Sequence, residues 1–221
     1  ELSVNITQPP LLLANASSTN QTAVGVNDGT ATAQPAGGTA PYSYNWSNNA
    51  TTQTITGLAP GTYTVSVTDG NNCTAVQTVT VNAFNCTLTA TISTVNVSCA
   101  GNSNGQATAV PAGTTQSVTY AWSNSATTST ISNLTAGTYT VIVSDAVGCV
   151  AVSTATITEP APLLAAVENI NHVDCPEDKD GSAIASASGG TAPYQIAWPN
   201  GSNGQNLGVG TYIFTVTDAN G

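Results

Sequence analysis

One stretch of apolar and polar residues in near-alternation occurs three times along the chain. Each copy begins Gly-Thr-Tyr and ends in an aspartate, and the copies occupy residues 61–69, 137–145 and 210–218. Apolar side chains at every second position predict a β-strand with one buried face. A leucine stands three residues before each glycine, which gives the pattern Leu-x-x-Gly-x-Tyr. This pattern is typical of a tyrosine corner, in which the tyrosine hydroxyl bonds to the backbone upstream at one end of a β-sandwich.

The rest of each copy also predicts short strands separated by turns. The expected first strands cover 11–16, 88–94 and 163–169, the second strands 30–34, 106–110 and 182–187, and the closing strands 74–81 and 150–157. A third strand in each copy carries a tryptophan, and a further short strand lies near Ile55 and Ile131. Turns recur about every eight to twelve residues and no segment has helical periodicity, so the sequence predicts an all-β sandwich fold.

The spacing between equivalent residues predicts the domain organisation. Trp46, Trp122 and Trp198 follow one another at intervals of 76 residues. A unit of this length can enclose its own core, whereas solenoid repeats typically have only ~20–45 residues. We therefore predict three domains. They are residues 1–82, which include an N-terminal strand or linker at 1–10, residues 83–159, and residues 160–221, which stop before the last strand.

Proline-containing segments precede two of the predicted first strands. They read Gln-Pro-Pro-Leu at 8–11 and Glu-Pro-Ala-Pro-Leu at 159–163. Proline fixes its backbone torsion and lacks an amide donor, so these segments predict short, semi-rigid linkers. The alternating segment Leu-Ser-Val-Asn-Ile at 2–6 comes before the first linker, so the chain is expected to begin in mid-strand. By analogy with the turn at 145–149, we expect a cysteine to follow residue 221 in a longer parent protein.

The charge balance is strongly acidic. The chain has 11 acidic residues, one basic residue, Lys179, and a formal net charge of −10 at pH 7. Binding to nucleic acid or to anionic lipid depends on Lys and Arg, so both partners are disfavoured. No stretch reaches the ~20 apolar residues of a membrane span. Only 5% of the residues are charged, so solubility depends on Thr, Ser, Asn and Gln, as is typical of an extracellular surface.

Five cysteines indicate disulfide bonds in an oxidising location. Cys99 ends a predicted first strand and Cys149 begins a closing strand, so we expect them at one end of the sandwich and bonded to each other. A loop of about 50 residues closed in this way contributes several kcal/mol of stability. Cys73 is expected to reach Cys86 only if the chain doubles back, because eight extended residues span ~26 Å. Cys175 is equivalent to Cys99 and is expected to be unpaired, because its partner would follow the last residue.

Two interpretations of the tryptophans are considered: a platform on which sugars stack, and a place in the core of each sandwich. On the third strand of the first two copies, a tyrosine and a tryptophan stand two residues apart. Side chains at this spacing point to one face of a strand, and a tryptophan on the third strand is typical of a sandwich core. We therefore assign the tryptophans and the corner tyrosines to the core. They are Trp46, Trp122, Trp198, Tyr63, Tyr139 and Tyr212.

An acidic loop in the third copy is the candidate calcium site. Its carboxylates belong to Asp174, Glu177, Asp178 and Asp180. The Asp-x-Asp-Gly ending is similar to part of a calcium-binding loop, but the bidentate glutamate at EF-hand spacing is missing. The matching loop of the second copy, at 102–105, is uncharged, so calcium binding is not a property of every copy. For the aspartates that end the three alternating stretches, calcium and an Asx turn stay open as alternatives. No other cofactor is expected.

Residues that carry catalysis are scarce. The chain has one histidine and no arginine, and no Ser-His-Asp set can be placed together. A glycosidase needs two carboxylates that flank a cleft, whereas these acidic residues fall mostly in turns at equivalent positions of successive copies. We therefore expect no enzymatic activity.

Three motifs together resemble a known family. They are Gly-Gly-Thr-Ala-Pro-Tyr-x-Tyr-x-Trp-Ser-Asn, Thr-Thr-x-Thr-Ile-x-x-Leu-x-x-Gly-Thr-Tyr-Thr-Val and Asp-x-x-Gly-Cys. The combination is similar to the SprB-type repeat of gliding-motility adhesins and related surface proteins of the Bacteroidetes. The resemblance implies tandem Ig-like β-sandwich domains in an elongated array whose last domain is incomplete, and a cell-surface filament exported by the type IX secretion system. The chain departs from the pattern where the first copy lacks the early cysteine and Ile196 replaces a tyrosine.

These observations favour a structural role outside the cell. We interpret the chain as a rigid, extended stalk segment of a large secreted cell-surface adhesin or filament that acts in adhesion or gliding motility. The expected partners are further repeats of the same chain, surface polysaccharides and other cell-surface proteins, without nucleic acid or direct membrane insertion. Two alternatives stay open, namely an array of polysaccharide-binding modules and the accessory domains of a secreted hydrolase.

Overall fold

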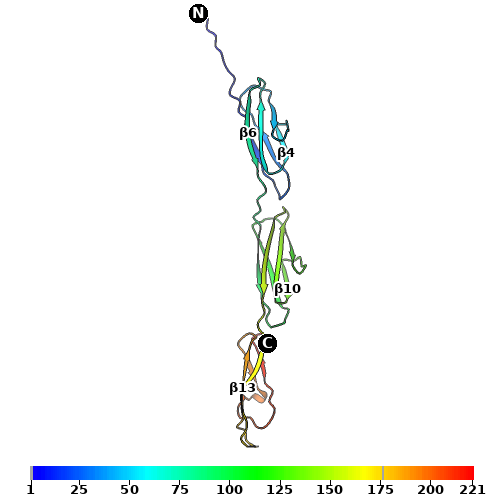
Figure 1. Cartoon of the computed structure of the whole chain (residues 1–221), viewed down its shortest axis with the longest axis vertical. Coiled ribbons are helices and arrows are strands. Elements are labelled where there is room, and N and C mark those ends of the chain that lie inside the picture. Colours follow the sequence, from blue (N-terminus) through cyan, green and yellow to red (C-terminus); the bar gives the residue numbers. More distant parts are fainter. Residues whose placement is uncertain (1, 176) are drawn as a thin grey trace. The chain divides into compact units, whose positions relative to one another are not determined.

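The computed structural model describes residues 2–175 and 177–221 (Figure 1). The regular elements of these residues are β-strands, apart from one 3-10 turn, η1 (Pro199–Gly201), so the predicted all-β class is confirmed. The described part of the chain holds no helix that could serve as a membrane span. Two compact units divide the chain. The first comprises residues up to 88 with 113–118 and 144–150, and the second comprises 89–112, 119–143 and 151–221. The three predicted domain boundaries therefore stay a proposal.

The first copy folds as a sandwich of two three-stranded antiparallel sheets. One sheet has the order β1 (Ala16–Thr19), β2 (Gly29–Ala33), β4 (Thr54–Leu58), and the other has the order β3 (Ser43–Trp46), β5 (Gly61–Thr68), β6 (Thr74–Val81). Figure 1 labels one strand of each sheet, β4 and β6. An immunoglobulin-like sandwich has this order: its first, second and fourth strands form one sheet and its third, fifth and sixth form the other. The tyrosine corner lies on the fifth strand.

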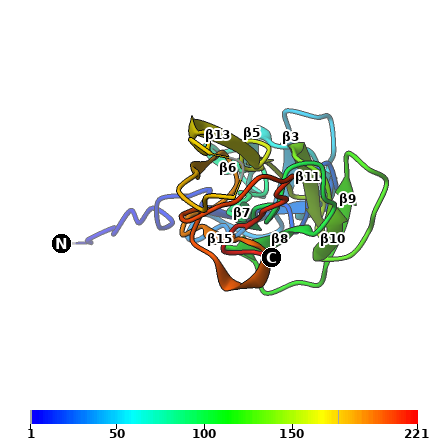
Figure 2. The same cartoon turned by 90° about the horizontal axis from the view of Figure 1, so that it is seen from below.

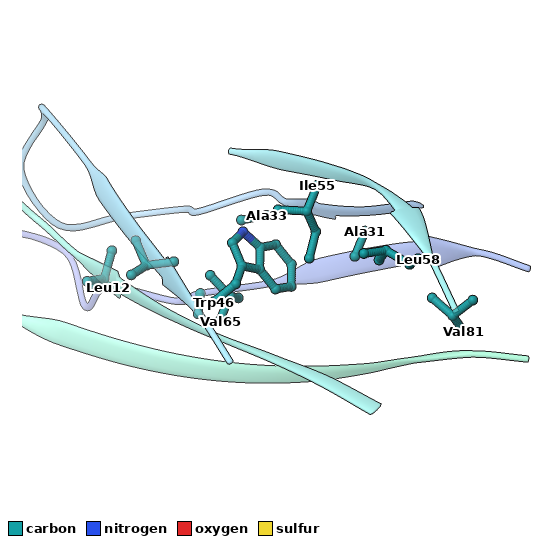
Figure 3. Close-up of a cluster of buried hydrophobic side chains, with 10 residues drawn as sticks. Leu12, Ala31, Ala33, Trp46, Ile55, Leu58, Val65 and Val81 are labelled. Carbon is teal, nitrogen blue, oxygen red and sulfur yellow. The ribbon is translucent and has the colours of Figure 1, made fainter. Parts of the chain in front are cut away.

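The core of the first copy lies between these two sheets around Trp46 (Figure 3). The indole of Trp46 lies beside Ala33 and Ile55, and Val65 is its cross-strand partner on β5. Small alanines on β2 leave room for this large ring, because close-packed interiors match large residues with small ones. The buried set consists of Leu12, Ala14, Ala31, Ala33, Trp46, Ile55, Leu58, Val65, Val67 and Val81.

The second copy repeats this strand order. One sheet contains β7 (Thr89–Val95), β8 (Gly105–Ala112) and β10 (Thr130–Leu134), with β8 in the centre. The other contains β9 (Val118–Trp122), β11 (Gly137–Asp145) and β12 (Val150–Ile157), with β11 in the centre. Figure 2 views strands of this copy nearly end on. The same alternation of residues therefore produces the same immunoglobulin-like sandwich twice.

The third copy has two shorter sheets. β13 (Leu164–Asn171) pairs with β14 (Ser182–Ser188), and β15 (Gln195–Ala197) pairs with β16 (Thr215–Thr217). An isolated bridge between Gly181 and Leu207 stands where β2 meets β4 in the first copy. The described residues of this copy contain no counterpart of β6 or β12. Its last strand is only three residues long, whereas β5 has eight residues and β11 has nine.

One expected strand is displaced. Residues 11–16 were predicted to form the first strand of the first copy, but β1 begins at Ala16 and only the bridge Leu13–Ala36 precedes it. Asn15 has a positive φ of 20°, outside the β region, so the chain turns between the bridge and the strand. The first strands of the second and third copies begin within one residue of their predicted starts.

Candidate functional site

A disulfide bond joins Cys86 to Cys149. The sulfur atoms are 2.05 Å apart, the Cα atoms are 5.5 Å apart, and 63 positions separate the two residues in sequence. Cys86 lies just before β7, and Cys149 lies just before β12. The neighbouring loop brings them to the same end of the sandwich, because the hydroxyl of Thr87 donates to Gly113 O and that of Thr114 donates to the Asp145 carboxylate at 3.0 Å. The bond therefore encloses every strand from β7 to β11.

The predicted Cys99–Cys149 pair is wrong, and the weaker alternative, Cys73–Cys86, does not form either. Cys99 follows β7, whereas Cys149 precedes β12, and the end of β7 lies beside the end of β12, where Thr158 N donates to Asn96 Oδ1 at 3.0 Å. The length of a strand, ~3.3 Å per residue, therefore separates Cys99 from Cys149. Cys73 does not reach Cys86, which is bonded elsewhere. Free thiols belong to Cys73, Cys99 and Cys175.

The aspartate that follows β5 closes a turn. Its carboxylate, on Asp69, accepts hydrogen bonds from the backbone N–H groups of Asn71, Cys73 and Thr39, each at 2.9 Å. Asp69 is only 5% exposed. The hydrogen bond from the Thr39 backbone N–H is the largest cause that lowers the pKa of Asp69 below its ordinary value. Both carboxylate oxygens are thus occupied by donors, which is the Asx-turn arrangement.

The other two copies repeat this turn. The carboxylate of Asp145 accepts from Val147 N at 3.1 Å and from Cys149 N at 2.9 Å. That of Asp218 accepts from Asn220 N at 2.9 Å and from Thr191 N at 2.8 Å. In every copy one further donor comes from the loop after the second strand, about 30 residues upstream. The aspartate therefore fastens two loops at one end of the sandwich.

The candidate calcium loop does not gather its carboxylates. Among the described residues, no three acidic, histidine or cysteine side chains stand close enough together to hold a metal ion, so Asp174, Glu177, Asp178 and Asp180 do not form the expected site. Instead Asp180 Oδ1 accepts from Asp174 N at 3.4 Å. The same bond occurs from Thr22 to Asp28 and from Ser98 to Asn104, both at 3.1 Å. This position therefore closes a loop in all three copies, whether its side chain is charged or neutral.

The tryptophans differ in burial. Trp46 is 2% exposed and Trp122 is 4% exposed, and each indole N–H donates to a backbone carbonyl, Thr52 O at 3.0 Å and Thr128 O at 2.9 Å. Trp198 is only half-buried and packs against Phe214 with ring centroids 5.1 Å apart. The first two rings thus occupy the core, whereas one part of Trp198 stays accessible.

All three corner tyrosines make the expected hydrogen bond. Tyr63 donates to Ala59 O at 3.0 Å, and Tyr139 and Tyr212 donate at 3.1 Å to the carbonyl four residues upstream. Their predicted burial is wrong, because Tyr63 and Tyr139 are half-buried and Tyr212 is 38% exposed. These rings lie at the end of the sandwich, where the hydroxyl reaches the backbone outside the core. Val65 and Val141, two residues further on, are fully buried.

A second tyrosine contact was not predicted. Tyr42 OH donates to Gly37 O at 2.6 Å, and Tyr194 OH donates to Gly189 O at 2.5 Å. Both tyrosines directly follow a cis Ala-Pro peptide bond. The Gly-Gly-Thr-Ala-Pro-Tyr motif that 37–42 and 189–194 share was the available signal.

Comparison with known proteins gives one family match. The SprB repeat matches residues 15–51, 91–127 and 167–203, together half of the chain. No curated protein matches the chain. Solved structures with likeness include murine CEACAM1b (14% identity, 66% of this chain and 100% of that chain, TM-score 0.28) and the immunoglobulin domains 1–5 of Sidekick-1 (14%, 91% and 49%, 0.31). Another is a tetra-tandem repeat from the extending region of a large adhesion protein (15% identity, 94% of this chain and 62% of that chain, TM-score 0.27).

Proposed function

The chain belongs to the SprB repeat family, and we propose that it is a structural segment of a large secreted cell-surface adhesin. In this proposal it serves as a rigid stalk in surface adhesion or gliding motility, and the type IX secretion system exports it. Its partners are further repeats of the same chain, and surface polysaccharides or other surface proteins are contacted by the adhesin as a whole. The role is structural rather than catalytic.

The position of the disulfide is the observation that carries this proposal. A pulling force along the backbone enters the second copy before Cys86 and leaves it after β12. Because Cys86 and Cys149 are bonded, the force crosses the disulfide and bypasses residues 87–148, which contain β7 to β11. Only β12 then carries the load. This covalent path suits a segment that must keep its length under tension.

The surface chemistry supports an extracellular location. Disulfides persist in oxidising compartments and are rare in the cytosol. The single Lys179 leaves trypsin-like proteases one basic residue at which to cleave. A chain with so few charged side chains depends on hydroxyl and amide groups for solubility, and hydroxyl pairs such as Thr64–Thr78 and Thr140–Thr154, each 3.0 Å apart, cover the outer face of the sheets.

The burial of the tryptophans argues against an array of sugar-stacking modules. Stacking needs an exposed ring face, but Trp46 and Trp122 are buried and their N–H groups are engaged. A glycan array with the isolated chain tests this alternative. We expect no selective, saturable binding. Saturable binding that disappears in a Trp198→Ala variant would contradict the stalk role.

Stretching single molecules tests the stalk role itself. We expect the second copy to resist loads that unfold the first copy. The cysteine of the first copy, Cys73, is a free thiol and forms no disulfide that could bypass its strands. Full unfolding of both copies at the same load, under oxidising conditions, would contradict the proposal.

A further inference from the structure

The turn that Asp145 closes in the second copy contacts a loop of the first copy. The backbone N–H of Val24, in the loop between β1 and β2, donates to Val147 O at 2.9 Å. Residues 113–118 and 144–150 are loops of the second copy, yet they belong to the same compact unit as the first copy. The contact therefore lies inside one unit, and it joins two successive copies at a place other than their linker.

The loop of the first copy, residues 20–28, is held in shape by bonds within its own copy. The Asp28 carboxylate accepts from the backbone N–H of Thr22 at 3.1 Å and from the hydroxyl of the same residue. At the base of the loop, Gln21 N donates to Asn82 O at 3.2 Å. The turn of the second copy is closed by its own aspartate. Two surfaces that are ordered in advance lose little conformational entropy when they meet.

Gly148 shows how closely the two surfaces approach each other. A Cβ added to this glycine would lie 3.2 Å from the Cβ of Val24, a tighter approach than real Cβ atoms usually make. The positive φ of Gly148, 85°, does not by itself require glycine, because Asn72 occupies the same place in the turn of the first copy with a φ of 65°. A residue without a side chain thus suits the approach of Val24 as well as the turn.

The second and third copies repeat this contact. The side-chain amide of Asn220 donates to Ser98 O at 2.6 Å, and both residues lie in the second compact unit. Ser98 is equivalent to Thr22, 76 positions earlier, and Asn220 is equivalent to Val147, 73 positions earlier, which is also the spacing of the turn aspartates. The bonded atoms differ, but the same loop meets the same turn in both places.

The disulfide fastens the turn to the linker. Cys149 directly follows Gly148, and its partner, Cys86, stands at the end of the segment that connects β6 to the second copy. Phe84, in the same segment, is half-buried and lines a cleft together with Thr22 and Val147. The linker and the turn are therefore covalently tied to each other on the side that faces the loop.

We propose that the loop between the first and second strands of each copy is a docking surface for the Asp-x-x-Gly turn of the next copy. Successive copies then touch at a second point besides their linker. Relative motion is the default for domains that only a linker joins, and a second point of contact restrains it. This inference rests on the proposed stalk function and names the surface by which neighbouring repeats hold each other.

Hydrogen exchange of the Val24 amide in the whole chain tests the docking. Gly148→Asn keeps the positive φ, as Asn72 does, but puts a side chain against Val24, so this amide should exchange about tenfold faster or more. Gly25→Asn is the matched control, because a side chain at this glycine, with a φ of 70°, has nothing within 4 Å. It should leave the exchange unchanged. Equal acceleration in both variants, or an unprotected Val24 amide in the parent chain, would overturn the proposal.

A second variant acts from the other side of the contact. Val24→Asp lies on an exposed loop of the first copy and puts a carboxylate beside the turn that Asp145 closes, so it disfavours docking without altering the second copy. NMR relaxation of the backbone amides measures how each copy tumbles. We expect one shared rotational correlation time for the first two copies of the parent chain, and shorter, separate values in Val24→Asp and Gly148→Asn.

The result that contradicts docking is distinct from one that contradicts the stalk. Separate correlation times already in the parent chain, or no change in either variant, would overturn the docking surface. They would leave the load path through the Cys86–Cys149 bond untouched, because stretching measures that path independently.

Discussion

The carboxylate of Asp69 accepts a hydrogen bond from the backbone N–H of Thr39, 30 residues earlier in the chain, at 2.9 Å. Asp218 and Thr191 repeat the contact at 2.8 Å in the third copy. An Asx turn alone satisfies only nearby donors, whereas this bond also ties the turn after β5 to the loop that follows β2. One short side chain therefore fixes two loops at the same end of the sandwich.

This contact predicts a pH dependence for the first copy. The pKa of Asp69 is lowered in the folded chain below the ordinary value of 3.8. Its stabilising effect is therefore complete above that value and disappears as the pH falls below 3.8 towards the folded pKa. In urea unfolding, the chain should be more stable than an Asp69→Asn variant at neutral pH, and the difference should shrink in acid. A difference that stays constant with pH would contradict this account.

Burial predicts unequal effects for the tryptophans. Trp46→Ala removes a buried ring and should lower the free energy of unfolding of the first copy by about 3–5 kcal/mol. Trp198→Ala should cost less than half as much, because its ring is only half-buried. Urea unfolding followed by hydrogen exchange in each copy measures both. Equal losses would show that the third copy is packed as tightly as the first.

The tyrosine corner predicts a small, local effect. Tyr139→Phe keeps the ring and removes the hydroxyl that donates to Thr135 O at 3.1 Å. We expect a loss of about 0.5–1.5 kcal/mol in the stability of the second copy, the usual net value of one hydrogen bond. Hydrogen exchange of the Thr135 region should speed up more than that of β8. No change in either quantity would mean that the bond contributes nothing.

The strand pattern was predictable because it depends on local periodicity. Alternation in residues 61–69 and their copies, the Leu-x-x-Gly-x-Tyr spacing and the tryptophan strand were enough for the all-β class and for the corner hydrogen bonds. The start of β1 was not predictable in this way. The positive φ of Asn15 breaks the strand there, and apolar residues on both sides of it concealed the break.

The Cys86–Cys149 disulfide could not be predicted by comparing the copies with one another. The positions equivalent to Cys86 are Pro10 and Pro162, so no internal repeat marks it, whereas Cys99 and Cys149 both have cysteine counterparts. The correct pair depends on which end of the sandwich each residue occupies. That requires the direction of β7 relative to β12, a feature of the assembled sheets. The same reason explains why the burial of the corner tyrosines was predicted wrongly. The alternation along the strand predicts that they are buried, but they lie at the end of the sandwich, where they are partly exposed.

Stretching single molecules with and without reductant measures the load path most directly. Reduction should free residues 87–148 between Cys86 and Cys149, which adds about 21 nm of extension at ~3.4 Å per residue when the second copy unfolds. Cys86→Ser should give this longer extension without reductant, and Cys99→Ser, the matched control, should leave it unchanged. The account predicts that the extra extension appears only when the Cys86–Cys149 bond is absent. The same extension with the bond intact would contradict it.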